Sequence, residues 1–220
     1  MIIGVCGLIG AGKDTIADYL VNIHQFRRES FANTLKDAVS AVFGWDRELL
    51  EGRTRHSRAW REQVDPWWAD RLGIPDLTPR WVLQYWGTEV VRRGFHDDTW
   101  IASLENRLRK TTDDVVISDC RFSNEIDAIK RAGGSVIRVV RGSEPEWYLL
   151  AESVNAGPTN ITWSLSKDQL AKYNIHASET AWIGTEFDAV IDNNSTMDHL
   201  YSQLTGLVQD LQASKPSPTC

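Results

Sequence analysis

The residues with the clearest chemical meaning form one short run near the N-terminus, Gly7-Leu8-Ile9-Gly10-Ala11-Gly12-Lys13-Asp14-Thr15. An apolar segment, residues 2–6, precedes this run, and a helical pattern follows it. Glycines let backbone N–H groups close around a polyphosphate, the N-terminus of a helix attracts the same charge, and Lys13 can reach the outer phosphates. The run therefore predicts a Walker A phosphate-binding loop, although Asp14 stands where that pattern has Ser or Thr.

A second candidate group is a carboxylate at the end of an apolar strand. Residues 115–117 are Val-Val-Ile, and Ser118 and Asp119 follow them. In a parallel sheet, ligands bind at the carboxyl ends of the strands, where an acid can hold Mg²⁺ or its water shell. Strands also end in Asp for reasons of turn geometry, so the metal assignment of Asp119 depends on the phosphate loop. Arg121 could reach a phosphate from the same edge, or it could form a surface ion pair with Glu125.

A third feature is a segment rich in arginine and tryptophan. Between Trp45 and Trp100 lie seven of the ten tryptophans and nine arginines, but no lysine. Arginine without lysine suits bidentate recognition of phosphate. The tryptophans could stack on a nucleobase, but for most of them a small helical core is the better interpretation.

The best-defined helix of this segment begins at Pro79 and closes near Gly94. Helical spacing predicts a polar face with Gln84, Thr88 and Arg92 beside an apolar stripe made by residues 83, 86 and 90. This polar face could read a nucleotide or could be an ordinary solvated surface.

The remaining pattern predicts one α/β domain in a chain of 220 residues. Strands expected at 2–6, 115–117, 136–140 and 189–191 alternate with helices, which favours a mostly parallel sheet covered on both faces. The helices are expected at 13–22, 33–43, 79–93, from 99, at 125–132 and through Leu211 at the end. Periodicity fails in 45–77, and 141–182 is a polar stretch.

Composition and charge exclude several classes. The net charge of −6 argues against a general nucleic-acid binder, and no apolar run is long enough to span a membrane. No signal peptide precedes the loop. Three cysteines at no metal-ligand spacing indicate reduced thiols in a cytoplasmic protein.

Together, these motifs resemble the bacteriophage deoxynucleoside monophosphate kinases, a branch of the P-loop nucleoside monophosphate kinases. Asp14 after the loop lysine is familiar within this branch. Besides the loop, the resemblance depends on Leu83-Gln84-Tyr85-Trp86-Gly87-Thr88-Glu89-Val90-Val91-Arg92, Ser118-Asp119-Cys120-Arg121-Phe122-Ser123-Asn124-Glu125, His176-Ala177-Ser178-Glu179, and Ser30-Phe31-Ala32 before Lys36.

The resemblance implies transfer of the γ-phosphoryl group of ATP, with Mg²⁺, to deoxynucleoside 5′-monophosphates for DNA synthesis. It implies a P-loop three-layer α/β fold with a five-stranded mostly parallel sheet. The single kinase domain would cover 1–211: a core of 1–44, 99–141 and 185–211, a helical NMP-binding insertion at about 45–98, and a lid at about 142–184. Residues 212–220 would form a disordered tail. The partners would be ATP and the monophosphate, with no nucleic acid or membrane, a homodimer as an option, and the cytoplasm, that of the host for a phage protein, as location.

The resemblance also implies roles for individual residues. The catalytic set would be Lys13, Asp14, Arg121 and Arg141, and the metal would be held by Asp14 and Asp119. ATP would contact the loop and Asn193, through Gly7, Gly10, Ala11, Gly12, Lys13, Asp14, Thr15 and Asn193. The substrate would contact Lys36, Trp86, Thr88, Glu89, Arg92, Arg121 and Glu179. A P-loop kinase of another small phosphorylated acceptor, such as dephospho-coenzyme A or phosphomevalonate, is the first alternative, and an NTP-hydrolysing switch is the second.

Overall fold

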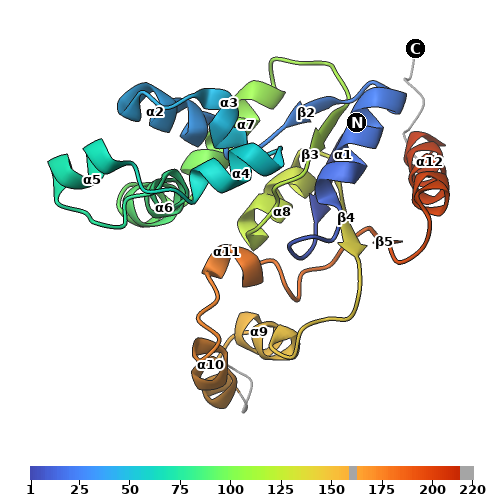
Figure 1. Ribbon diagram of the computed structural model, residues 1–220. Coiled ribbons are helices and arrows are strands. Elements are labelled where there is room, and N and C mark those ends of the chain that lie inside the picture. Colours follow the sequence, from blue (N-terminus) through green and yellow to red (C-terminus); the bar gives the residue numbers. More distant parts are fainter. Residues whose placement is uncertain (159–162, 214–220) are drawn as a thin grey trace. The chain divides into compact units, whose positions relative to one another are not determined.

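The computed structural model describes residues 1–158 and 163–213 (Figure 1). Its contacts divide the chain into two compact units. We call residues 1–29 together with those from 112 onward the sheet unit, and residues 30–111 the helical unit.

The sheet unit contains a five-stranded parallel sheet in the order β2-β3-β1-β4-β5. This confirms the predicted fold class. Only β2 was not expected, because its three residues, Arg-Arg-Glu, carry no apolar pattern. The strands are β1 (Ile2–Cys6), β2 (Arg27–Glu29), β3 (Val115–Ile117), β4 (Ser135–Val140) and β5 (Ala189–Asp192).

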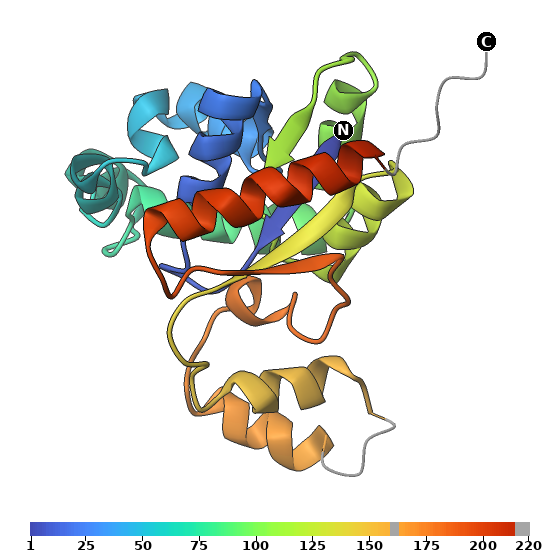
Figure 2. The same ribbon diagram turned by 90° about the vertical axis from the view of Figure 1, so that its right-hand side faces the viewer.

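The two faces of β1 explain how helices cover the sheet. Successive side chains of a strand point to opposite faces. Ile3 and Val5 are fully buried in a core that includes apolar residues of α1 (Lys13–His24) and α12 (Met197–Ala213). Gly4 faces the other way, where a Cβ would lie 2.6 Å from Ile129 of α8 (Ser123–Arg131). Figure 2 shows α12 crossing the sheet on one side, with α8 behind it.

The segment after β4 is less irregular than its sequence indicates. The polar stretch 141–182 contains α9 (Tyr148–Asn155), α10 (Trp163–Ala171) and α11 (Ala177–Thr180). The first two pack side by side in both views (Figures 1 and 2). They escaped sequence analysis because helices this short complete too few turns to show a clear periodicity.

The helical unit contains six α-helices and one π-helix. Although periodicity fails in 45–77, this segment forms three short helices. Asp46, Thr54 and Asp65 each accept hydrogen bonds from the first-turn amides of these helices, so local capping replaces periodicity as the signal. The elements are α2 (Asn33–Phe43), α3 (Arg47–Glu51), α4 (Arg55–Arg61), α5 (Pro66–Leu72), α6 (Pro79–Tyr85), η1 (Trp86–Arg93) and α7 (Thr99–Leu108).

Several tryptophans of this unit form a small aromatic cluster around Phe43. Phe43 packs against Trp45, Trp68 and Trp86 with ring centroids 4.5, 4.8 and 5.4 Å apart. The indole N–H of Trp45 donates to Asp65 at 2.8 Å. Aromatic pairs at these separations stabilise a small core beyond their buried area.

The predicted helix from Pro79 to near Gly94 changes type at Trp86. Up to Tyr85 it is α-helical, and Trp86–Arg93 is π-helical. Because a π-helix joins residues five apart, side chains rotate away from the α-helical stripes. Arg92, expected on a polar face, is therefore 6% exposed, and Val90, expected on the apolar stripe, is 44% exposed.

The predicted domain boundaries stay a prediction, but the compact units differ from them. Residues 30–44 and 99–111 were placed in the core, and they cluster with the helical unit because α2 packs against α3, α6 and α7. The predicted tail begins two residues too early, since α12 continues to Ala213, and 214–220 lie outside the described residues. No helix in the described part of the chain is long and apolar enough to cross a membrane.

Cys6, at the end of β1, and Cys120, shortly after β3, are expected to resist thiol reagents in the native protein. Both side chains are buried, at 0% and 2% exposure, and burial raises the pKa of Cys120. In a Cys220→Ser variant, an aromatic disulfide reagent should label neither thiol until denaturant unfolds the chain. Rapid labelling of both in the folded protein would contradict the strand assignments.

Candidate phosphate-binding site

The glycine-rich loop joins β1 to α1 in a conformation that side chains would prevent. Gly7 has a φ of 151°, and a Cβ there would lie 2.6 Å from the carbonyl oxygen of Val139. Gly12 is the N-cap of α1 with a φ of 106°. Positive φ is accessible mainly to glycine, so these two positions explain why the loop needs this residue type.

The start of α1 leaves donors for an anion. No side chain caps this helix, and the first amides of a helix have no partner within it. The N–H groups of Lys13, Asp14 and Thr15 therefore remain to bind a negatively charged group, which the helix dipole also favours. This arrangement is compatible with the predicted phosphate-binding loop, which stays a prediction.

Lys13 closes the loop from within the sheet unit. Its Nζ donates to the carbonyl oxygens of Gly7 and Leu8 at 2.8 and 2.9 Å. Burial lowers the pKa of Lys13, and the neighbouring Arg121 lowers it further, whereas Glu179 and Asp14 oppose the shift. Phosphate oxygens would compete with these carbonyl groups for the ammonium of Lys13, which could then donate its hydrogen bonds to phosphate instead.

Asn193 supports the loop from the end of β5. Its side-chain N–H donates to the carbonyl oxygen of Ala11 at 2.8 Å, and the residue is 8% exposed. This bond assigns a positioning contact to Asn193, and its predicted contact with adenine stays a prediction. Gly10, the exposed turn of the loop, has φ 78°.

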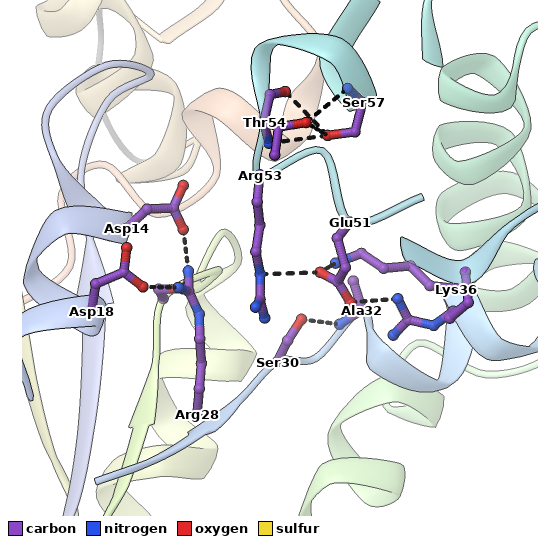
Figure 3. A network of polar contacts seen from close by, with 12 residues as sticks. Asp14, Asp18, Arg28, Ser30, Ala32, Lys36, Glu51, Arg53, Thr54 and Ser57 are labelled. Carbon is purple, nitrogen blue, oxygen red and sulfur yellow. Dashed lines mark hydrogen bonds and ion pairs between the residues drawn. The ribbon is translucent and has the colours of Figure 1, made fainter. Parts of the chain in front are cut away.

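Arg28 is a part of this site that sequence reasoning missed. From β2, its guanidinium pairs with the carboxylates of Asp14 and Asp18 and donates to the Ser118 hydroxyl at 2.9 Å (Figure 3). It thus connects the residue after the loop lysine to the carboxyl end of β3. The spacing of Asp14 and Asp18, one helical turn apart, was the only local signal for a shared cation.

Arg121 and Glu179 meet although 58 residues separate them. Arg121 Nη1 donates to Glu179 Oε1 at 2.5 Å. Glu125, the partner considered for Arg121, instead accepts from the backbone N–H groups of Arg121 and Phe122 at 2.8 and 3.2 Å. This ion pair connects α11 to the segment that follows β3. Both of its charges act on the pKa of Lys13, which Arg121 lowers and Glu179 raises.

Arg141 lies where β4 leaves the sheet. Its side chain is exposed and lines a small hollow that also contains Leu8 and Ala11 of the loop. Nearby Arg138 pairs with Glu144 and lies 4.9 Å from the ring centroid of Tyr148. The sheet unit thus carries several cations around one phosphate loop.

The predicted metal ligands, Asp14 and Asp119, suit a magnesium ion that also binds substrate and water better than a metal site built from protein ligands alone. Among the described residues, no three His, Cys, Asp or Glu side chains could together hold a metal ion. Asp14 is largely exposed, with 71% of its side chain accessible. Magnesium commonly uses one or two carboxylates together with substrate phosphates and water, so the predicted pair Asp14 and Asp119 fits that ion.

The remaining predicted substrate residues lie in the helical unit, and several have protein partners. Lys36 pairs with Glu51 at 2.8 Å (Figure 3), and Lys36 and Arg47 hold the pKa of Glu51 at about 2 despite its burial. Glu89 pairs with Arg93 at 2.5 Å and Arg92 with Asp97 at 3.1 Å. Trp86 and Thr88 are half-buried.

Comparison with known proteins identifies relatives along nearly the whole chain. No family model matches. A protein of Acanthamoeba polyphaga mimivirus named deoxynucleotide monophosphate kinase is 29% identical over 225 residues, covering 96% of this chain and 97% of that protein. The deoxynucleoside-5′-monophosphate kinase of Escherichia phage T5 is 26% identical over 240 residues, covering 86% and 91%. The chain is a homologue of these viral kinases. The predicted resemblance is confirmed.

Solved structures add only weak similarity. Shikimate kinase from Aquifex aeolicus vf5 aligns with a TM-score of 0.47 and 9% identity, covering 98% of this chain and 100% of that one. Dephospho-CoA kinase from Campylobacter jejuni aligns with a TM-score of 0.42 and 14% identity, covering 96% of each chain. At this level of similarity, the fold assignment of this viral-kinase homologue depends on its own strand order.

Proposed function

We propose that this protein transfers the γ-phosphoryl group of ATP to deoxynucleoside 5′-monophosphates, producing the diphosphate and ADP. The observation that carries the proposal is near full-length homology to two proteins named as kinases of this substrate class. The phosphate loop with Lys13 at its centre supports the same reaction, since it offers backbone donors and one cation to a polyphosphate. No observation favours a different acceptor.

On the donor side, the loop would hold the ATP phosphates. Backbone amides of the loop and of the first turn of α1 would bind the β- and γ-phosphates, and Lys13 would transfer its bonds from the loop carbonyls to them. Asn193 would keep the loop in shape through Ala11. Cations at these points stabilise the charge that develops on the transferred group.

Asp14 and Asp119 would hold Mg²⁺, directly or through water. A magnesium ion held there would supply charge neutralisation to the phosphates of ATP. Arg28 would position Asp14, because its guanidinium already links that carboxylate to Asp18 and Ser118. An exposed carboxylate fixed in this way loses less side-chain freedom when it meets the metal.

On the acceptor side, the monophosphate is already an anion and needs no strong general base. Arg121 and Arg141 would neutralise charge between the two phosphates, and Glu179 would orient Arg121. Lys36, Trp86, Thr88, Glu89 and Arg92 would contact the phosphate, sugar or base. Catalysis would then come from alignment and charge neutralisation, which together can supply large effective molarities.

We further propose that the insertion at about 45–98 binds the monophosphate and that 142–184 is a lid. Closure of this lid would keep water from acting as the phosphoryl acceptor. A cytoplasmic location agrees with the two buried free thiols, Cys6 and Cys120. A homodimer remains part of the proposal.

The test is a coupled ADP-release assay with Mg-ATP and a panel of deoxynucleoside and ribonucleoside monophosphates. We expect turnover with one or more deoxynucleoside monophosphates and near silence with ATP alone. The Lys13→Ala variant, purified in the same way, controls for contaminating kinases. Silence across the panel, with ATP still bound, would refute the proposal, and hydrolysis of ATP without acceptor would indicate a switch.

A further inference from the structure

Arg28 of β2 is a largely buried cation beside two exposed carboxylates of α1. Only 17% of its side chain is accessible to solvent. Its Nη1 donates to Asp18 at 2.8 Å, and its Nη2 donates both to Asp14 and to the Ser118 hydroxyl (Figure 3). Partners on α1 and at the end of β3 therefore fix this guanidinium, unlike an ion pair on the surface, which solvent screens.

Asp14 brings a negative charge to the place where a phosphate is expected to bind. It lies in the first turn of α1, directly after Lys13, where the general Walker A pattern has a neutral hydroxyl. The positive end of the helix dipole attracts a carboxylate and a phosphate alike, and these two anions repel each other at short range. Without a compensating cation, Asp14 would weaken the binding of a polyphosphate to the loop.

Arg28 has the position that such compensation requires. The nitrogen that pairs with Asp14 is the one that Ser118 also holds, so the guanidinium stays beside Asp14 although a second carboxylate is available. The preceding residue, Arg27, pairs instead with Glu29 at 3.1 Å and with Asp113 at 3.6 Å. Successive side chains of a strand point to opposite faces. Of the two arginines of β2, Arg28 is therefore the one that faces α1.

We propose that Arg28 is a positioning residue that compensates the charge of Asp14, so that the loop can bind a polyphosphate beside a carboxylate. The occupant is the triphosphate of ATP, and this part rests on the proposed function. Arg28 acts through Asp14 and does not itself contact the phosphates. A magnesium ion held by Asp14 would supply part of the same compensation, so the need for Arg28 is greatest without metal.

The experiment is a double-mutant cycle of Arg28→Gln and Asp14→Ser, measured as the affinity for ATP in EDTA by calorimetric titration. We expect Arg28→Gln to weaken metal-free ATP at least ~10-fold, and the double variant to return to within ~3-fold of the parent protein. Inorganic tripolyphosphate should show the same pattern, because it carries the charge without the nucleoside. Arg27→Gln removes the same charge from the neighbouring position and should bind as the parent does.

The same titrations separate compensation from other roles of Arg28. An undiminished loss of affinity in the double variant would overturn the proposal, because Arg28 would then bind phosphate itself or support the fold. In excess Mg²⁺ the loss caused by Arg28→Gln should become smaller, and an equal loss with and without metal would indicate a structural arginine. Should Arg28→Gln not fold, Asp14→Ser alone decides: it should bind metal-free ATP at least as tightly as the parent, and weaker binding would overturn the proposal.

Turnover distinguishes this inference from the proposed function. If deoxynucleoside monophosphates are phosphorylated but the two substitutions act independently on ATP affinity, the function stands and the compensation is wrong. If the substitutions are coupled for ATP and tripolyphosphate but no monophosphate reacts, the compensation by Arg28 stands and the proposed function is wrong.

Discussion

Replacing Lys13 with alanine is expected to reduce kcat by ~100- to 1,000-fold. The ammonium lies at the centre of the loop, bonded to the carbonyl oxygens of Gly7 and Leu8, where it can transfer to the outer phosphates of ATP. Removing one preorganised donor to a developing charge commonly has an effect of this size. Steady-state kinetics with saturating monophosphate would measure it.

Lys13→Arg is the matched control, because it keeps the charge but changes its shape and reach. Binding of ATP to both variants by calorimetry would show whether the loop still forms. Parental kcat in Lys13→Ala would contradict the assignment of this loop as the donor site. A loss of ATP binding with unfolding of α1 would assign Lys13 a structural role in closing the loop.

Arg92→Ala is expected to lower kcat/KM for the monophosphate by ~10- to 100-fold and to leave the KM for ATP unchanged. The residue is one of the predicted acceptor contacts, and its guanidinium is held by Asp97 at 3.1 Å in the last turn of η1. Since the side chain is 6% exposed, the substitution should also lower the free energy of unfolding by about 1–3 kcal/mol. Kinetics and denaturant unfolding together measure both effects.

Asp97→Asn separates the two contributions. It weakens the ion pair but leaves the Arg92 charge in place, and the Asp97 side chain is 68% exposed. We expect this control to retain most of the parental kcat/KM. If Asp97→Asn reproduces the full kinetic loss of Arg92→Ala, the position that the ion pair gives to Arg92, and not its charge alone, is what the acceptor site requires. If Arg92→Ala changes neither kinetic constant for the monophosphate, Arg92 does not belong to the acceptor site.

Local patterns were sufficient for the framework of the donor site. The strand, the glycines and Lys13 follow each other directly, so their geometry is set by neighbours in the chain. The glycines at 7 and 12 adopt the positive φ values that their residue type allows. The alternation of apolar strands with helices likewise predicted a parallel sheet, because each crossover needs a helix of its own.

Periodicity in the sequence did not predict the short helices or the π-helix. Three helices between 45 and 77 complete two turns at most, so capping residues such as Asp46 and Asp65, and not periodicity, mark them. The π-helix from Trp86 turned Arg92 inward and Val90 outward. An α-helical period cannot anticipate that rotation, because it arises from a change in hydrogen-bond spacing.

The sequence by itself determined the phosphate loop, the lysine within it and the alternation of apolar strands with helices that predicts a parallel sheet. Only the tertiary structure decided which polar side chains meet: Arg28 with Asp14 and Ser118, and Arg121 with Glu179. The physical reason is that loop geometry depends on adjacent residues. Charge pairing depends on side chains that lie tens of residues apart and meet only when the chain has folded.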